Sequence, residues 1–244
     1  MLLRDTQTNL RPRLRSVAST VAAVMAVFAI ASQAHASVLT VGASVGGAPT
    51  GVNYVNFNNL ALGSGGGSSG GVTVSFTPNG QVVNGSKPGY YAAPYLSNGN
   101  GTLFGDTTNG PDTTNYLTTG LGTVTVALPG EEKYVGLLWG SVDTYNTLTL
   151  YNNSTLVGTV TGSDVTANAN GDQGADGTFY VNINSTTSFN SIVASSTQYA
   201  FEFDNLAYNS TIPTAPEPGT LALLGVGLGL VGFAAASRRK RPNA

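Results

Sequence analysis

The chain has 244 residues, no cysteine, and a formal net charge of −2 at pH 7. Without cysteine it can form no disulfide bond and carry out no thiol chemistry, so packing, hydrogen bonds or a metal ion must stabilise the fold. Between residues 37 and 218 only two lysines stand against eleven carboxylates, a net charge of about −9, and this acidic, arginine-free stretch excludes nucleic-acid binding.

The first 36 residues have the parts of a secretory signal peptide. Four arginines precede a mostly apolar stretch over residues 17–30. Ala34 and Ala36 then form a small-x-small cleavage site, and Ser37 is the expected first residue of the mature chain. We therefore expect residues 1–36 to form a signal helix that engages the secretion translocon and is removed by signal peptidase. The alternative is an uncleaved N-terminal anchor.

Residues 37–210 carry the pattern of a single all-β surface domain. Gly, Asn, Ser and Thr dominate, and apolar residues alternate with polar ones, which is typical of half-buried strands. The dense apolar run over residues 134–139 predicts a central strand covered on both faces, with Trp139 in the core. The other predicted strands are residues 38–41, 52–57, 72–76, 124–128, 147–151, 155–160, 179–183, 189–194 and 199–203.

Turn residues separate these strands. Pro78-Asn79-Gly80 and Leu128-Pro129-Gly130 predict turns, and Asn152-Asn153 predicts a hairpin. We expect the Gly/Ser run over residues 63–71 to be a mobile loop, and residues 87–111 to be an excursion at one end of the domain. Ten or so short strands joined in this way predict an antiparallel β-sandwich of jelly-roll-like topology.

The C-terminal segment reads as a membrane anchor. Residues 211–219 are a proline-rich linker, which we expect to be extended, and residues 221–236 contain no polar side chain. Residues 219–237 would form a helix of roughly 28 Å, close to the ~30 Å of a hydrocarbon core, so we expect residues 220–244 to supply a single transmembrane helix and a basic tail. By the positive-inside tendency, the tail stays cytoplasmic. Its basic residues are Arg238, Arg239, Lys240 and Arg241.

This order of features resembles the PEP-CTERM sorting signal of bacterial exosortase substrates. Pro216, Glu217 and Pro218 form the tripeptide, and the apolar helix and basic tail follow it. The resemblance implies that exosortase, a membrane-embedded cysteine protease, recognises the three residues and cleaves near them. It also implies a chain anchored in the inner membrane before processing and placed afterwards on the outer surface or in the extracellular matrix, in bacteria that make exopolysaccharide. It implies nothing about the activity of residues 37–210.

A possible metal site lies near the end of the predicted domain. Glu202 and Asp204 should point to one face of a strand, about 7 Å apart, and could join Asn205 in binding calcium through hard oxygen ligands. The same two carboxylates could act as the acid and base of a glycosidase. The alternative without a ligand is a solvated outer face, or a pair of acceptors that cap a loop. A Gly-rich loop over residues 164–176 is interpreted as a series of Asx turns, with a loose calcium-binding loop as the alternative.

Tyr90 and Tyr91 are the candidate ligand-binding residues, because exposed aromatic faces often stack on sugars. The alternative is that they pack at the edge of a sheet. A block in the second half is also similar to one found in some exosortase-dependent surface proteins. It comprises residues 139–146, 180–182 and 201–205, and it has no settled activity.

Three functions follow from these observations. The first is a non-catalytic surface or extracellular-matrix protein of a biofilm, sorted by exosortase. The second is a carbohydrate-binding module, possibly dependent on calcium, that attaches to exopolysaccharide. The third is a secreted polysaccharide-degrading enzyme, which is disfavoured because the mature domain has no His, Cys or Arg to assist catalysis. We therefore expect no enzymatic activity and no obligatory cofactor.

Overall fold

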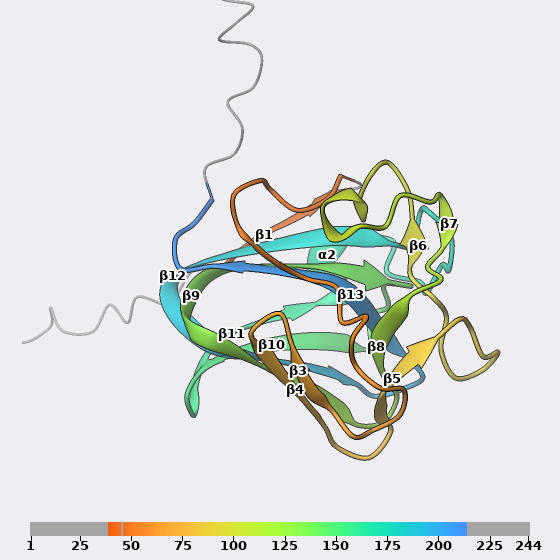
Figure 1. Ribbon diagram of the computed structural model, residues 1–244, viewed down its shortest axis with the longest axis horizontal. Helices are drawn as coiled ribbons and strands as arrows, with labels where there is room; N and C mark the ends of the chain where they lie inside the picture. The colour runs from red at the N-terminus through yellow and green to blue at the C-terminus, as the bar shows by residue number, and fades with distance from the viewer. Residues whose placement is uncertain (1–38, 45, 214–244) are drawn as a thin grey trace, which may run out of the picture. The chain divides into compact units, whose positions relative to one another are not determined.

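A computed structural model describes residues 39–44 and 46–213, which are mostly β-strand (Figure 1). The strands are β1 (Leu39–Ser44), β2 (Asn53–Val55), β3 (Gly67–Ser69), β4 (Val72–Phe76), β5 (Gly80–Asn84), β6 (Tyr95–Leu96), β7 (Gly110–Pro111), β8 (Asn115–Thr119), β9 (Thr123–Gly140), β10 (Asn146–Asn152), β11 (Thr155–Thr161), β12 (Phe179–Ser196) and β13 (Phe201–Asn209). The helices of this region are η1 (Thr102–Phe104) and α2 (Gly162–Val165).

The predicted all-β class is confirmed for this region. Neither η1 nor α2 exceeds four residues, and no helix within residues 39–44 and 46–213 is long and apolar enough to cross a membrane. The expected signal helix, its cleavage site, the tripeptide of residues 216–218, the transmembrane helix and the basic tail all lie outside the described residues.

Eleven strands form one antiparallel sheet. Its central path runs β11-β10-β12-β9-β13-β8-β5, with β1 added to β12, β2 to β13, and the β3–β4 hairpin to β9. A separate two-stranded sheet joins β6 to β7. Antiparallel pairing was predicted and is confirmed. The jelly-roll-like sandwich stays a prediction, because hydrogen bonds join these eleven strands into a single sheet.

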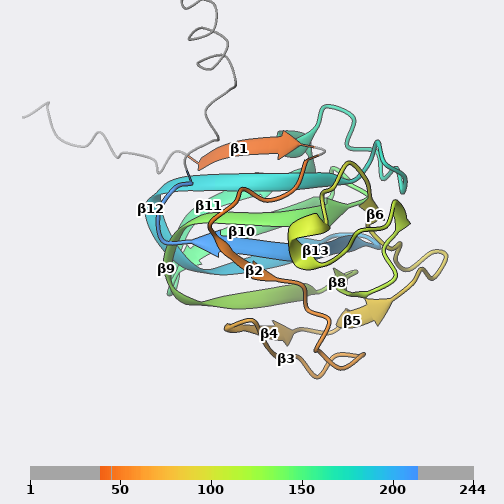
Figure 2. The same cartoon turned by 45° about the horizontal axis from the view of Figure 1, so that its top comes forward.

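β9 and β12 are each 18 residues long, and each belongs to two parts of the sheet (Figure 2). The first half of β9 pairs with β4, and its second half pairs with β13. The expected turn at Pro129 is therefore wrong: β9 continues through it. Its register against β12 is irregular there, with Ala127 opposite Ser191 and Glu132 opposite Phe189. Pro129 lies in this irregular stretch, where its missing N–H breaks no regular ladder hydrogen bond.

The main core is built from both halves of the sheet. Val124 and Val126 from the first half of β9 belong to the same buried cluster as Leu137 and Trp139 from the second half. The Trp139 ring is fully buried and stacks on Phe201, with the ring centroids 4.2 Å apart. The predicted central, buried strand at residues 134–139 and the predicted core role of Trp139 are both confirmed.

Some of the predicted turns are confirmed, and one predicted loop is wrong. The hairpin at Asn152-Asn153 is confirmed, since β10 and β11 pair across it. The turn at Asn79 is also confirmed, with a positive φ of 72°. The mobile loop expected over residues 63–71 is wrong, because its second half forms β3 and pairs with β4. The glycines and serines of this stretch show no alternation of apolar and polar residues, so the sequence did not indicate a strand there.

Residues 85–113 cover the outer face of the central strands, and this cover positions the candidate sites. In Figure 2, η1 lies in front of β13. Leu96 and Phe104 of this covering segment pack with Tyr134 and Leu138 of β9 and with Tyr180 of β12. The second half of β9 is therefore buried on both faces. The expected excursion is present, but it is a packed layer that contains β6, η1 and β7.

Candidate functional site

β13 presents two carboxylates to the covering segment. Phe201 and Phe203 point into the main core, so Glu202 and Asp204 face the opposite side. The expectation of a solvated outer face is wrong, because Glu202 is 2% exposed and Asp204 is 0% exposed. Sequence alternation placed both residues on one face, but it could not indicate that residues 85–113 would bury that face.

Glu202 lies at an open cleft of about 410 Å³ that is lined mainly by polar and tyrosine side chains. Its Oε1 accepts a hydrogen bond from the Ala92 backbone N–H at 2.8 Å, and its Oε2 accepts one from Ser141 Oγ at 2.5 Å. Burial, with a smaller contribution from the nearby charge of Asp143, raises the pKa of Glu202 to about 7, although its hydrogen bonds from Ser141 and Ala92 act in the opposite direction. Glu202 therefore fits the alternative in which its carboxylate caps a loop by accepting hydrogen bonds.

Two tyrosines from distant parts of the sequence form one wall of this cleft. Tyr90 is 48% exposed and Tyr199 is 41% exposed, and their ring centroids lie 5.3 Å apart. Lys87 Nζ lies 4.1 Å from the centre of the Tyr90 ring. Tyr91, the second predicted ligand-binding residue, also lines the cleft but is half-buried and packs edge-on against Tyr116. Tyr199 was not predicted, because only the fold brings it beside Tyr90.

Two backbone segments that also line the cleft, at Asp143 and Gly171, approach each other closely. Asp143 pairs with Asn170 in an isolated antiparallel bridge, and Gly171 N–H donates to the Val142 carbonyl at 3.0 Å. Gly171 has φ of +74°, and a Cβ there would lie 2.6 Å from Asp143 Oδ2. Glycine is thus required at this point by both conformation and space. The Asx-turn prediction for this loop is confirmed, since Asp172 Oδ1 accepts from Gly174 N–H at 2.7 Å.

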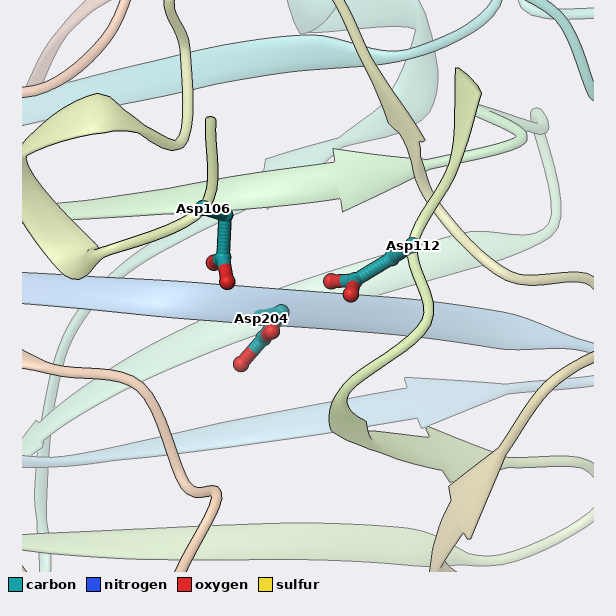
Figure 3. Close-up of side chains that lie close together, drawn as sticks. All are labelled: Asp106, Asp112 and Asp204. Atoms are coloured by element: carbon teal, nitrogen blue, oxygen red, sulfur yellow. The ribbon is translucent and has the colours of Figure 1, made fainter. Parts of the chain in front are cut away.

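Asp204 belongs to a second group of side chains. Asp106, Asp112 and Asp204 come from three segments, and one oxygen from each lies within 4.8 Å of the others (Figure 3). At this separation two full negative charges repel by roughly 3 kcal/mol at an effective dielectric constant of about 20. Burial raises the pKa of Asp204 well above its ordinary value, and the charge of Asp112 adds to the effect. Burial also raises the pKa of Asp106.

A β-bulge directs Asn205 into the same group. Asp204 lies opposite Leu138, whereas Ala207 lies opposite Gly136, so β13 has one more residue than β9 in this interval. Asn205 takes up the extra residue with a positive φ of 52°. In a regular strand its side chain would point away from that of Asp204. Here its Nδ2 instead donates to Asp106 Oδ2 at 3.0 Å.

The structure therefore brings together part of the predicted metal site. Asp204 and Asn205 are adjacent as expected, while the carboxylate of Glu202 is hydrogen-bonded at the cleft. Asp106 and Asp112 were missed, because they lie about a hundred residues earlier in the sequence. A weak local signal existed at Asp112, whose Oδ1 accepts from Thr114 N–H and Oγ1, both at 2.7 Å, in an Asx turn.

These features define an antiparallel β protein with a tyrosine-lined cleft and a buried acidic cluster beside it. Comparison with protein families shows that the chain carries a PEP-CTERM protein-sorting motif over residues 214–240. This match includes Pro216, Glu217 and Pro218 and confirms the resemblance found in the sequence. The motif supports exosortase-dependent sorting of an exported surface protein. No curated protein matches the chain.

Proposed function

We propose that this protein is a non-catalytic component of the bacterial outer surface or extracellular matrix, released from an inner-membrane anchor by exosortase. The observation that carries the proposal is the sorting motif over residues 214–240. The apolar stretch and basic residues that follow Pro218 support a membrane-anchored precursor. A signal sequence at residues 1–36 supports entry into the export pathway. A jelly-roll-like sandwich, with both halves of the bent sheet around one core, is our interpretation of the exported domain.

The sorting step can be tested with Glu217→Ala in the native bacterium. We expect an unprocessed form that stays in the membrane fraction, detected by fractionation and intact mass. Thr211→Ala, outside the matched residues, is the control and should be processed normally. Normal release and mass of the Glu217→Ala protein would refute recognition through the tripeptide. Intact mass of the extracellular form would also locate both cleavage points and any attached glycan.

A second proposal concerns the exported domain: the cleft binds a neutral saccharide of the exopolysaccharide. Tyr90 and Tyr199 are adjacent and both exposed, and aromatic side chains of this kind favour contact with sugar rings. Asp143, Asn170 and Gln173 line the same cleft and offer hydrogen-bonding groups for hydroxyls. The carboxylates would repel acidic polysaccharides, so a neutral sugar is the better fit.

Titration of the mature protein with neutral exopolysaccharide fragments tests this binding. Tyr90→Ala and Tyr199→Ala should each weaken affinity about tenfold or more, in line with the loss of about 1.5 kcal/mol or more from an aromatic contact. Leu156→Ala removes an exposed apolar side chain of β11 and should leave affinity unchanged. Unaltered affinity in both tyrosine variants, or binding by neither the wild type nor the control, would refute the role of the cleft.

We further propose that the cleft binds sugars without cleaving them. Both oxygens of Glu202 already accept hydrogen bonds from the protein, which leaves this carboxyl poorly placed to protonate a leaving group. Among the described residues that line the cleft, none is His, Cys or Arg. Reproducible hydrolysis of a polysaccharide by the wild type, abolished in Glu202→Gln, would contradict this proposal.

A further inference from the structure

We propose that Asp106, Asp112, Asp204 and Asn205 form a calcium site that fastens residues 85–113 to the bulge of β13. The site is separate from the tyrosine-lined cleft and does not depend on saccharide binding. Asp106 and Asp112 belong to the covering segment, whereas Asp204 and Asn205 lie on β13, about a hundred residues later. One carboxylate oxygen from each aspartate lies within 4.8 Å of the others (Figure 3).

Several oxygen atoms of this cluster are buried without a hydrogen-bond partner and are available to bind a cation. Asp204 is 0% exposed, and neither of its carboxylate oxygens has a hydrogen-bond partner of good geometry among the described residues. Polar groups that act on it include the Asn205 backbone N–H and the Asp112 carboxyl. Asp112 Oδ2 and Asn205 Oδ1 are likewise buried without a partner. Buried polar atoms are normally satisfied, and four unsatisfied oxygens in one place require an explanation. A cation bound between the carboxylates would supply the missing partner.

Other polar atoms of Asp112 and Asn205 form hydrogen bonds, and these bonds orient the oxygens that have no partner. Asp112 Oδ1 accepts from both Thr114 N–H and Thr114 Oγ1, which leaves Oδ2 available. Asn205 Nδ2 donates to Asp106 Oδ2, so the amide is fixed with its oxygen unpaired. Hydrogen bonds of this kind commonly fix the orientation of metal ligands.

The charge balance also favours a cation over protons alone. Lys87 and Lys133 are the only basic side chains between residues 39 and 213. Lys87 lies against the Tyr90 ring. Three carboxylates with oxygens within 4.8 Å of one another therefore concentrate negative charge in a domain that has few basic side chains. A divalent ion would compensate that charge.

Calcium fits this donor set better than the other common biological cations. The available donors are carboxylate and amide oxygens, with neither histidine nor cysteine among the cluster residues, which disfavours zinc. Magnesium retains several waters and demands nearly ideal octahedral geometry, whereas calcium accepts six to eight oxygens in flexible arrangements. A largely buried site with donors from separate loops is therefore suited to calcium.

Thermal unfolding of the purified mature protein tests the site. Calcium at about 100 times its Kd should raise the Tm by roughly 5–10 °C over the value in chelator, and calorimetric titration should give one ion per chain. Magnesium at equal concentration should give a smaller shift. An equal magnesium shift would overturn the choice of calcium, and no shift with calcium would overturn the site.

Three variants locate the effect. Asp204→Asn replaces the buried carboxyl by a neutral isostere of the same shape, so the variant should fold in chelator and lose the calcium shift. Asp106→Asn, at the more accessible edge of the cluster, should weaken calcium binding at least tenfold and provides a second variant if Asp204→Asn fails to fold. Asp176→Asn removes an exposed carboxylate and should respond as the wild type does. A full calcium response in the foldable cluster variants would refute the assignment.

Discussion

The side-chain amide of Asn205 donates a hydrogen bond of 3.0 Å to Oδ2 of Asp106, which is 99 residues earlier in the chain. Asn205 occupies the extra position of a β-bulge and has a positive φ of 52°. Tyr180 Oη also donates to the Asn205 carbonyl at 3.0 Å. One residue thus sets the bend of β13, anchors the segment above it and adds an amide oxygen to the acidic cluster.

Asn205→Ala should lower the free energy of unfolding by about 2–3 kcal/mol. The variant loses the hydrogen bond to a carboxylate and places a Cβ in a left-handed conformation that asparagine tolerates better than alanine. Asn205→Gly loses the same hydrogen bond but accepts the backbone conformation, so it should lose less, about 1–2 kcal/mol. Urea denaturation measures both values. Equal losses in the two variants would show that the positive φ costs nothing.

The bulge marks the limit of what the sequence predicts here. Strict alternation placed Glu202 and Asp204 on one face, and the structure confirms it, because alternation is local. The same rule places Asn205 on the opposite face. It was grouped with Asp204 only because its amide oxygen could bind calcium. Asp106 and Asp112 could not be predicted, since their position depends on how residues 85–113 pack on the finished sheet.

The fold was predictable where apolar and polar residues alternate. β4 begins and ends where the sequence indicated, at Val72 and Phe76. The segments at residues 179–183 and 189–194 were also strands, but the structure joins them into β12. The sequence between them is polar, so the local pattern weakens where the strand bends. Pairings such as β1 with β12 depend on contacts across more than a hundred residues, which local periodicity does not encode.

Trp139 gives a test of the main core. Trp139→Ala should destabilise the domain by about 3–5 kcal/mol, because it removes a fully buried ring that stacks on Phe201. Trp139→Phe should cost less than half as much, since it keeps an aromatic ring and removes an indole N–H that has no partner in the described structure. Leu121→Ala, at an exposed site, should change stability by no more than about 0.5 kcal/mol. Equal costs for the two tryptophan variants, measured by urea denaturation, would contradict the stacking argument.

Adjacent residues Glu131 and Glu132 should affect the pH dependence of stability in opposite directions. Hydrogen bonds from Ser188 and Asn152 lower the pKa of Glu131, so its contribution is present above the unfolded-state pKa and is lost as pH falls through the folded-state pKa. Burial raises the pKa of Glu132, so its contribution is present below the unfolded-state pKa and is lost as pH rises through the folded-state pKa.

Glutamine substitutions separate the two carboxyls. Glu132→Gln should raise the urea midpoint at pH 7 relative to the wild type, and Glu131→Gln should lower it. At a pH below both folded-state pKa values, each difference should shrink, because the wild-type carboxyls are then neutral as well. Midpoints that shift in the same direction for both variants at pH 7 would contradict the assignment of buried and hydrogen-bonded roles.

Gly171→Ala should damage both stability and the cleft. Its φ of +74° is strained for alanine, and the added Cβ would lie 2.6 Å from Asp143 Oδ2, so the carboxylate or the loop must move. Gly85→Ala is a matched control with φ of +65° and no atom within 4 Å of the added Cβ. The control should lose about 1–2 kcal/mol from backbone strain alone, and Gly171→Ala should lose more. Only Gly171→Ala should also weaken saccharide binding, because it displaces Asp143 in the cleft. Equal losses of stability and unchanged affinity in both variants would mean that the close approach of Gly171 to Asp143 has no role in shaping the cleft.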